Sequence, residues 1–238
     1  MAKGQGGFAF KQFFIGHAQC AMKVGTDSIL LGSWVNVLQA TNILDIGTGS
    51  GLLAIMMAQK SAVDSRILGI DIDSSAIAQA WENGLRCPWP EKLSFDCVAL
   101  QAIDVHQQYD LIISNPPYFP HGQQFDVQRQ QARHTGELSH PQLIESVCSG
   151  LSRHGRFAFV LPTEPAFALI DMAEARGLHL QRQLWVKSRQ DKAPTRVLAE
   201  LGYQQTSQVD TQHLSIYDLH NHYTDAYKHL CRDFYLKF

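Results

Sequence analysis

Short runs of apolar residues alternate along the first two thirds of the chain with longer segments in which apolar residues recur at helical spacing. The short runs predict buried strands and the longer segments predict helices. Ser74 is expected to cap the third helix, and Pro141 to lie in the first turn of the fourth. The alternation predicts βαβ units and a parallel sheet. The predicted strands are 42–47, 66–73, 93–100, 109–114 and 156–162, and the predicted helices are 27–38, 52–60, 74–85 and 140–151.

The pattern changes beyond residue 177, where segments 178–188 and 195–203 suit antiparallel strands that close the sheet. The prediction is therefore an α/β fold with a mostly parallel seven-stranded sheet, helices on both faces and an antiparallel C-terminal edge. We find no internal repeat and no long linker. The chain is expected to form one domain over 1–238, with an N-terminal extension over 1–40 and the α/β core over 41–238.

Composition narrows the class of protein. Of the 238 residues, 45% are hydrophobic and 18% are charged, which is typical of a soluble globular protein. No apolar run reaches the roughly 18 residues of a membrane span, and the first residues lack the apolar segment of a secretory signal. Five scattered cysteines favour a reducing, cytoplasmic location and argue against a disulfide framework or a zinc site. They are Cys20, Cys87, Cys97, Cys148 and Cys231.

A glycine-rich stretch, "DIGTGSG" at 45–51, ends the first predicted core strand. Open α/β sheets bind ligands beyond the carboxyl ends of their strands, where glycines let a ligand approach the backbone. The dinucleotide fingerprint would need glycine at Leu52, and the chain contains no P-loop motif. Asp71 ends the second strand, where a carboxylate can accept the hydroxyls of a ribose. The stretch favours a nucleoside ligand, although a tight strand-to-helix turn would use the same glycines.

A second polar strand end is "SNPPYF" at 114–119. Proline has no backbone N–H and a fixed φ, so the strand must stop there, and Asn115 is held extended because a proline follows it. The stretch therefore presents an amide, a bared carbonyl and an aromatic ring in a rigid arrangement. A plain Asn-Pro turn is the alternative interpretation.

The motifs "DIGTGSG", "GIDID" and "NPPY", in this order, resemble those of class I S-adenosylmethionine-dependent methyltransferases, whose fold is Rossmann-like. The N-P-P-Y set is similar to that of enzymes that methylate exocyclic or amide nitrogens. Further segments resemble the bacterial adenine-N6 methyltransferases of valine tRNA, a family that modifies adenosine 37, just 3′ of the anticodon. These segments are "FAFKQFFIGHAQCAMKVGTDSILLG" (8–32), "DLIISNPPYF" (110–119), "RQQARHT" (129–135) and "DAYKHLCRDFYL" (225–236).

The resemblance implies S-adenosyl-L-methionine as the cofactor, no metal ion and no obligate protein partner. One position departs from the family pattern: Ala99 stands where relatives commonly place an acid that binds the cofactor adenine. The neighbouring backbone or a nearby acid such as Asp104 would then take that role. The cofactor-binding residues implied are Gly25, Thr26, Asp27, Asp45, Gly47, Gly49, Asp71 and Asn115, and the catalytic residues are Asn115, Pro116, Pro117 and Tyr118.

The N-P-P-Y stretch suits this chemistry because an aromatic amino group is a poor nucleophile, its lone pair being spread into the ring. The Asn115 side-chain oxygen and the Pro116 carbonyl can accept its two hydrogens and so localise the lone pair towards a methyl donor. Pro117 fixes the direction of the second carbonyl, and Tyr118 can stack on the base. Catalysis would then consist of positioning and electrostatics.

Basic residues suggest where a large RNA substrate could bind. The segment from Arg176 to Arg196 contains six basic residues against one acid, Asp191, and Lys3, Lys11 and Lys23 form a second basic stretch. Both could contact phosphates, or they could form a solvated charged face. The aromatic residues Phe8, Phe10, Phe13 and Phe14 could stack on RNA or form a small core. His220 and His222 are expected in a surface loop rather than at a metal site.

Three functions remain open. The leading one is the methylation of valine tRNA at N6 of adenosine 37, or of another nucleic-acid amino group. The second is a protein-glutamine methyltransferase resembling those that modify peptide release factors, although these usually carry a separate N-terminal helical domain and about 40 residues leave little room for one. The third is a non-catalytic module that binds S-adenosylmethionine or RNA, which the intact N-P-P-Y argues against.

Overall fold

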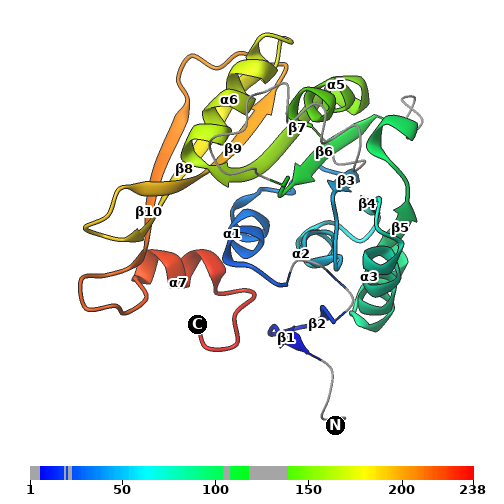
Figure 1. Cartoon of the computed structure of the whole chain (residues 1–238), viewed down its shortest axis with the longest axis horizontal. Coiled ribbons are helices and arrows are strands. Elements are labelled where there is room, and N and C mark those ends of the chain that lie inside the picture. Colours follow the sequence, from blue (N-terminus) through cyan, green and yellow to red (C-terminus); the bar gives the residue numbers. More distant parts are fainter. Residues whose placement is uncertain (1–5, 19, 21–22, 104–107, 118–138) are drawn as a thin grey trace.

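An eight-stranded sheet forms the centre of the protein, shown in Figure 1 as a computed structural model. The structure describes residues 6–18, 20, 23–103, 108–117 and 139–238. The strand order is β10-β8-β9-β7-β6-β3-β4-β5. The strands are β3 (Asn42–Ile46), β4 (Arg66–Asp71), β5 (Leu93–Cys97), β6 (Tyr109–Ser114), β7 (Leu151–Pro162), β8 (His179–Arg189), β9 (Pro194–Gly202) and β10 (Asp210–Tyr217).

The predicted Rossmann-like α/β fold is confirmed, but the strand count of seven is wrong because β10 was missed. This strand reads "DTQHLSIY", and Leu214 is its one buried side chain, so it lacks the apolar run or alternation that identified the others. The C-terminal edge also differs in detail. Only β9 runs antiparallel to its neighbours β7 and β8, whereas β10 pairs with β8 in parallel.

Helices cover the two faces of the sheet and enclose two separate apolar cores (Figure 1). One face carries α1 (Thr26–Trp34), α2 (Leu52–Lys60), α3 (Ser74–Arg86) and α7 (Asp225–Cys231). The other carries α5 (His140–Gly150) and α6 (Thr163–Glu174), and two short 3₁₀ helices, η1 (Pro90–Lys92) and η2 (Leu100–Ala102), flank β5. The expected cap of α3 was off by one residue, because Asp73 rather than Ser74 accepts the N–H of Ser75, at 2.8 Å.

The N-terminal extension forms a short hairpin of β1 (Gly7–Ala9) and β2 (Phe14–Gly16) ahead of α1. Phe10 and Phe13 stack with ring centroids 4.6 Å apart, and both are buried, with Phe234 against Phe13. Of the two interpretations of this aromatic cluster, the structure supports a small core for Phe10 and Phe13. Phe14 points outward and is 42% exposed.

No helix in the described part of the chain is both long and apolar enough to cross a bilayer. His220 and His222 lie in a surface loop after β10, as expected, where the Asp218 carboxylate accepts both of their backbone N–H groups, at 2.8 and 2.9 Å. Hydrogen bonds from these N–H groups lower the pKa of the Asp218 carboxyl.

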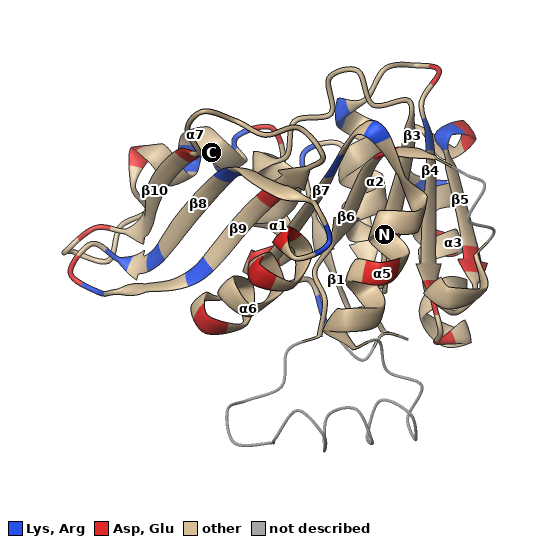
Figure 2. Ribbon diagram, turned by 90° about the horizontal axis from the view of Figure 1, so that it is seen from above, with Lys and Arg blue, Asp and Glu red and all other residues tan. Residues whose placement is uncertain are grey.

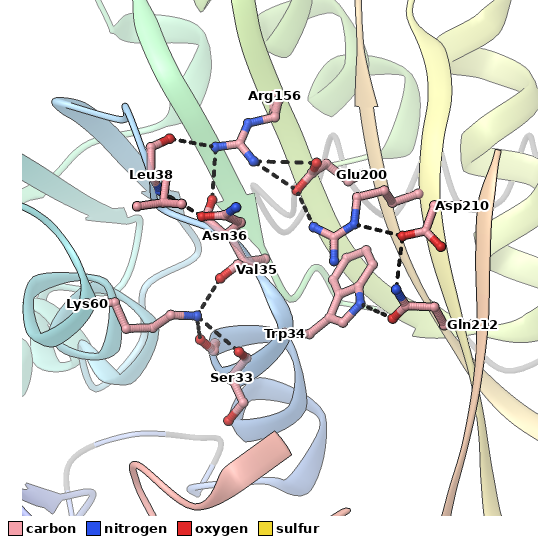
Figure 3. A network of polar contacts seen from close by, with 12 residues as sticks. Ser33, Trp34, Val35, Asn36, Leu38, Lys60, Arg156, Glu200, Asp210 and Gln212 are labelled. Atoms are coloured by element: carbon pink, nitrogen blue, oxygen red, sulfur yellow. Dashed lines mark hydrogen bonds and ion pairs between the residues drawn. The ribbon is translucent and has the colours of Figure 1, made fainter. Parts of the chain in front are cut away.

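A polar network ties the C-terminal strands to the segment after α1 (Figure 3). The Glu200 carboxylate on β9 is buried and lies 3.4 Å from the Arg156 guanidinium and 3.5 Å from that of Arg182. Arg182 also covers the ring of Trp34 at 4.5 Å, while Arg156 donates to the Asn36 carbonyl at 2.9 Å. Because Glu200 pairs with Ala158, near the start of the regular pairing of β7, this network lies far from the carboxyl ends of the strands.

Replacing Glu200 by alanine should leave two guanidinium groups without their buried counter-charge. We expect the free energy of unfolding to fall by on the order of 3 kcal/mol, with a melting temperature roughly 6–12 °C lower. Differential scanning calorimetry would measure this, with the exposed Glu174→Ala as the control. A melting temperature of Glu200→Ala equal to that of the control would show that the network contributes little.

Candidate functional site

A cavity of about 450 Å³ opens where the carboxyl ends of β3, β4 and β6 meet. Parallel α/β sheets bind their ligands at this edge. The polar part of its wall comes from Asp71 and Asp73 after β4 and from Ser114 and Asn115 at the end of β6. The two sequence motifs are therefore brought together in one site, as the sequence predicted for their strand ends.

The turn after β3 forms one wall of the cavity. Gly47 and Gly49 have φ values of 69° and 52°, a left-handed backbone conformation that favours glycine. A Cβ atom at either position would meet no other atom within 4 Å. No packing neighbour therefore demands the absence of a side chain there. The glycines serve the backbone conformation and leave space at the cavity wall for a ligand.

The Asp45 side chain lies beneath this turn and is fully buried. Its Oδ2 accepts the Thr48 hydroxyl at 2.6 Å and the Ala54 N–H at 3.1 Å, which fixes the turn onto the start of α2. Burial raises the pKa of this carboxyl to about 7, although both hydrogen bonds act in the opposite direction. Its Oδ1 is buried and has no hydrogen-bond partner among the residues that the structure describes.

Asp71 holds the same turn from the neighbouring strand. Its Oδ2 accepts the Gly49 N–H at 3.0 Å, and its Oδ1 accepts the Asp73 N–H at 3.0 Å. A carboxylate offers about four lone-pair sites. Asp71 therefore keeps acceptor capacity towards the cavity that it lines.

Asn115 lies at the end of β6 with its amide oriented by a residue that the sequence did not single out. Its Nδ2 donates to the Ser28 hydroxyl on α1 at 3.0 Å. This contact brings the start of α1 next to the N-P-P stretch. Because the donor end of the amide is engaged by Ser28, the acceptor oxygen Oδ1 is left for another group.

The two prolines follow Asn115 along the cavity wall, Pro116 being buried and Pro117 exposed. His140, at the start of α5, hydrogen-bonds to the backbone of Pro117. Burial lowers the pKa of His140 below its ordinary value, although the hydrogen bond to Pro117 acts in the opposite direction. Tyr118, predicted to stack on a base, lies outside the described residues, as does Asp104.

The "KVGTD" segment leads into the start of α1. Gly25 is the N-cap residue, and Gly25 and Thr26 are exposed. The Asp27 carboxylate accepts a hydrogen bond from the Arg196 Nε at 2.8 Å, and the two side chains form an ion pair between α1 and β9. These three residues do not line the cavity described above, although Ser28, which follows them, contacts Asn115.

The side of the cavity next to β5 is apolar. Ile72, Val98 and Leu100 form this wall, and Gln101 is the polar residue beside them. Ala99 caps the 3₁₀ helix η2 between Val98 and Leu100. A flat heterocycle could lie against such a wall, with the neighbouring backbone or Gln101 near its polar edge.

Asn83 on α3 joins the N-terminal hairpin to the glycine turn. Its amide accepts the Gly16 N–H at 2.9 Å and donates to the Gly16 and Ser50 carbonyls, each at 2.8 Å. The side chain is 1% exposed. Cys20, four residues after Gly16, lines the cavity, where burial raises the pKa of its thiol to about 11. Asn83 therefore helps to place the segment that completes the cavity wall.

The basic segment does not form one continuous surface. Three of its members are paired: Arg182 with Glu200 and Asp210, Arg189 with Asp191, and Arg196 with Asp27. Arg176 follows α6, whereas Lys187 and Lys192 lie at the β8–β9 hairpin. Lys11 donates to the Phe238 carbonyl at 2.8 Å, and Lys3 lies outside the described residues. Fewer basic residues are therefore available to bind RNA phosphates at the end of the sheet that carries the cavity than the sequence count suggested.

Ser28, Asn83, Cys20 and His140 are the residues at the site that sequence reasoning missed. Cys20 lines the cavity, and the other three contribute through contact with a residue far away in sequence, such as Asn115, 87 positions after Ser28. Serine in the first turn of a helix and asparagine within a helix are common, and neither type signals a distant partner. Only the position of Ser28 beside "KVGTD" could have drawn attention to it.

Comparisons with known proteins agree with this geometry. Residues 18–160 match the family described as Methyltransferase small domain. The tRNA1(Val) (adenine(37)-N6)-methyltransferase of Tolumonas auensis is 44% identical over 234 residues, covering 97% of each chain. The enzyme of the same name from Actinobacillus succinogenes is 43% identical, covering 99% of this chain and 100% of its own.

Among solved structures, a predicted O-methyltransferase of Agrobacterium tumefaciens superposes with a TM-score of 0.66 at 15% identity, covering 87% of this chain and 96% of its own. The sheet and the glycine turn at its edge are those of class I S-adenosylmethionine-dependent methyltransferases, and S-adenosylmethionine is the cofactor. Within that class, the chain belongs to the family of the tRNA1(Val) (adenine(37)-N6)-methyltransferases.

Replacing Asn83 by leucine should remove three hydrogen bonds between the hairpin, α3 and the glycine turn. We expect S-adenosylmethionine affinity to fall by on the order of tenfold or more, because each such bond contributes roughly 0.5–1.5 kcal/mol. Titration calorimetry would measure it. Gln79→Leu is the matched control, since Gln79 is buried on the same helix but donates to Glu82 instead. Equal cofactor affinity in the two variants would limit Asn83 to a role in stability.

Proposed function

We propose that this protein methylates N6 of adenosine 37 in valine tRNA, which would place its activity in the cytoplasm, where tRNA is used. The observation that carries the proposal is the Asn115 amide, held by Ser28 through its nitrogen at the wall of the cofactor cavity. The family relationship supports the choice of tRNA as substrate.

The residues of the cavity fit S-adenosylmethionine. Asp71 keeps acceptor capacity for the ribose hydroxyls, and Ile72, Val98 and Leu100 offer an apolar wall for the adenine. Asp45 lies beneath the glycine turn rather than in the cavity wall, and its orphaned Oδ1 is proposed to accept a hydrogen bond from the ammonium group of the methionine part. When bound, the cofactor supplies a methyl group that a nucleophile can accept.

The protein's contribution is to prepare the target nitrogen. Asn115 Oδ1 and the Pro116 carbonyl are proposed to accept the two hydrogens of the adenine amino group, which draws the nitrogen lone pair out of conjugation with the ring. Because the proline rings already fix the backbone, holding these acceptors in place costs no further backbone conformational entropy. A target base inside a folded RNA must first leave its stack. Tyr118 is proposed to stack on the base once it has done so.

Gly25, Thr26 and Asp27 are proposed to act at the methionine end of the cofactor by way of α1. The Asp27–Arg196 ion pair and the Ser28–Asn115 hydrogen bond both fix the first turn of that helix. The start of a helix carries a partial positive charge, which favours a carboxylate. The methionine part of the cofactor carries such a carboxylate.

Asn115→Ala should remove one of the two acceptors. We expect the single-turnover rate on valine tRNA to fall by on the order of 10²–10³, judged from the loss of one preorganised hydrogen-bonding group at other active sites. Ser28→Ala should leave the amide in place but free to turn, with a smaller loss of roughly 2- to 10-fold. The assay is methyl transfer followed by mass spectrometry of the nucleosides. A near-normal Asn115→Ala rate would exclude the proposed mechanism, and a methyl group anywhere but adenine N6 would exclude the proposed function.

Asp45 should make cofactor affinity depend on pH. Its carboxyl, with a pKa of about 7, gains a charge as the pH rises from about 5.5 to 7, where an α-amino group with a pKa of roughly 7.7–8.0 is still protonated. S-adenosylmethionine should therefore bind more tightly at pH 7, and Asp45→Asn should flatten the dependence. Calorimetric titrations over this range would measure it, and an identical profile in the variant would remove Asp45 from the cofactor site.

The stability of the cofactor-free protein should change in the opposite direction. Because the pKa of Asp45 is raised in the folded state, the folded protein binds the proton more tightly than the unfolded chain does. This contribution to stability is fully present below about pH 4 and is lost as the pH rises through about 7. Comparing the melting temperatures of the wild type and Asp45→Asn across that range isolates it.

A further inference from the structure

The outermost part of the sheet presents a face that α6 does not cover. Helix α6 buries Ala166, Leu169 and Ile170 in the core above β7 and β9. Farther out, alternate residues of β8 point to the same side of the sheet. They pair with residues of β10, Trp185 with His213 and Lys187 with Ser215. In Figure 1, β10 lies at the margin of the sheet, outside α6.

Three aromatic side chains form a continuous surface on this face, which we call the outer aromatic surface: Phe167, Trp185 and His213. The ring centroids of Phe167 and Trp185 are 5.3 Å apart, and those of Trp185 and His213 are 6.3 Å apart. Phe167 is 37% exposed and His213 is exposed. Trp185 lies between them, half-buried.

The chemistry of Trp185 suggests that its ring serves more than packing. Its Nε1–H is buried and has no hydrogen-bond partner among the described residues. An unpaired buried donor costs free energy. Phenylalanine or leucine would pack there without that cost, so the structure favours a use for the extended indole face.

The outer aromatic surface lies at the same end of the sheet as the cofactor cavity. Lys187 pairs with Pro194, whose carbonyl accepts the Thr163 hydroxyl at 3.2 Å at the start of α6. Two residues farther along β9, Arg196 pairs with Pro162 at the carboxyl end of β7 and binds Asp27. Asp27 precedes Ser28, which holds Asn115. A continuous series of contacts therefore joins this surface to the methyl-transfer site.

The charge beside the surface suits an anionic partner. The β8–β9 hairpin carries Lys187, Arg189 and Lys192 against Asp191, a local excess of two positive charges (Figure 2). Arg189 is engaged by Asp191 at 2.7 Å, so Lys187 and Lys192 supply the excess. Aromatic faces next to lysines are how proteins bind unpaired nucleotides, the rings stacking on bases and the cations contacting phosphates.

We propose that the outer aromatic surface binds an unpaired nucleobase of the tRNA anticodon loop, with Lys187 and Lys192 on the adjoining phosphates. This inference rests on the proposed function and extends it, because it gives the loop a second point of contact besides the target adenosine. A loop fixed at two points is held in register, so that one adenosine reaches Asn115. The β8–β9 hairpin would then determine which base of the loop is methylated.

The test measures the binding of a fluorescent anticodon stem-loop of valine tRNA by anisotropy. Trp185→Leu keeps apolar volume against α6 but removes the stacking face, and we expect the Kd to rise roughly 5- to 150-fold. Trp185→Phe should restore most of the affinity. Phe167→Ala with His213→Ala should also weaken binding without opening the core, since both side chains are exposed. Leu85→Ala is the control, an exposed apolar side chain on α3, which packs at the β5 end of the sheet.

Salt dependence separates stacking from charge. Lys187→Ala with Lys192→Ala should reduce the slope of log Kd against log salt by about 0.7 for each phosphate that the protein no longer neutralises, because fewer counterions are released from a single-stranded loop. Trp185→Leu should raise Kd and leave that slope unchanged. S-adenosylmethionine affinity and melting temperature should stay close to wild type in the Phe167–His213 double variant, which excludes misfolding as the cause.

The outcomes distinguish this inference from the proposed function. If wild type methylates valine tRNA while Trp185→Leu and the Phe167–His213 double variant bind the stem-loop as tightly as Leu85→Ala, the outer aromatic surface is not an RNA site and the proposed function stands. If wild type binds the stem-loop through Trp185 but transfers no methyl group to it, the surface stands and the proposed reaction is wrong. A wild type that does not bind the stem-loop overturns the inference.

Discussion

Two carboxylates, one on β3 and one on β4, bind the backbone turn after β3, and the rest of the site depends on these hydrogen bonds. Asp45 secures the Thr48 hydroxyl and the start of α2 from below, and Asp71 takes the Gly49 N–H from the next strand. A left-handed glycine turn has many alternative conformations, so it keeps one shape only where its N–H groups are bound. Asp71 also lines the cofactor cavity, which means that at this residue support of the turn and recognition of the ligand cannot be mutated independently.

Long-range polar contacts then place the remaining parts around this turn. Asn83 brings the N-terminal hairpin to it, Ser28 brings α1 to the N-P-P stretch, and Arg196 brings the C-terminal sheet to α1. Each contact joins elements that the apolar cores alone would place only approximately. The hydrophobic layers determine which faces pack, whereas these hydrogen bonds and ion pairs determine the register at which functional groups meet.

The strand ends that carry the site could be predicted because their sequence signals are local. A buried run followed by glycine or proline shows where a strand stops, and parallel topology brings such ends to one edge, which is why Gly47, Asp71 and Asn115 were expected to meet. Strand β10 could not be found this way, since an edge strand with one buried apolar residue has almost no periodic signal. The ion pairs of Arg182, Arg189 and Arg196 were likewise hidden, because a charge count does not reveal which charges neutralise one another.

The packing of the N-terminal hairpin against the last part of the chain has a consequence for biosynthesis. Phe10 bridges to Tyr235, the Lys11 N–H donates to the Phe234 carbonyl at 2.9 Å, and Phe13 lies edge-on to Phe234. A domain generally folds as a unit, and in the cell it does so during or after its synthesis. The hairpin is made first, yet the aromatic residues that bury it are made after every strand of the sheet. The contacts of the hairpin with Phe234 and Tyr235 can form only when translation has reached those residues, so an incomplete nascent chain lacks this support for the segment that leads through Cys20 to the cofactor site.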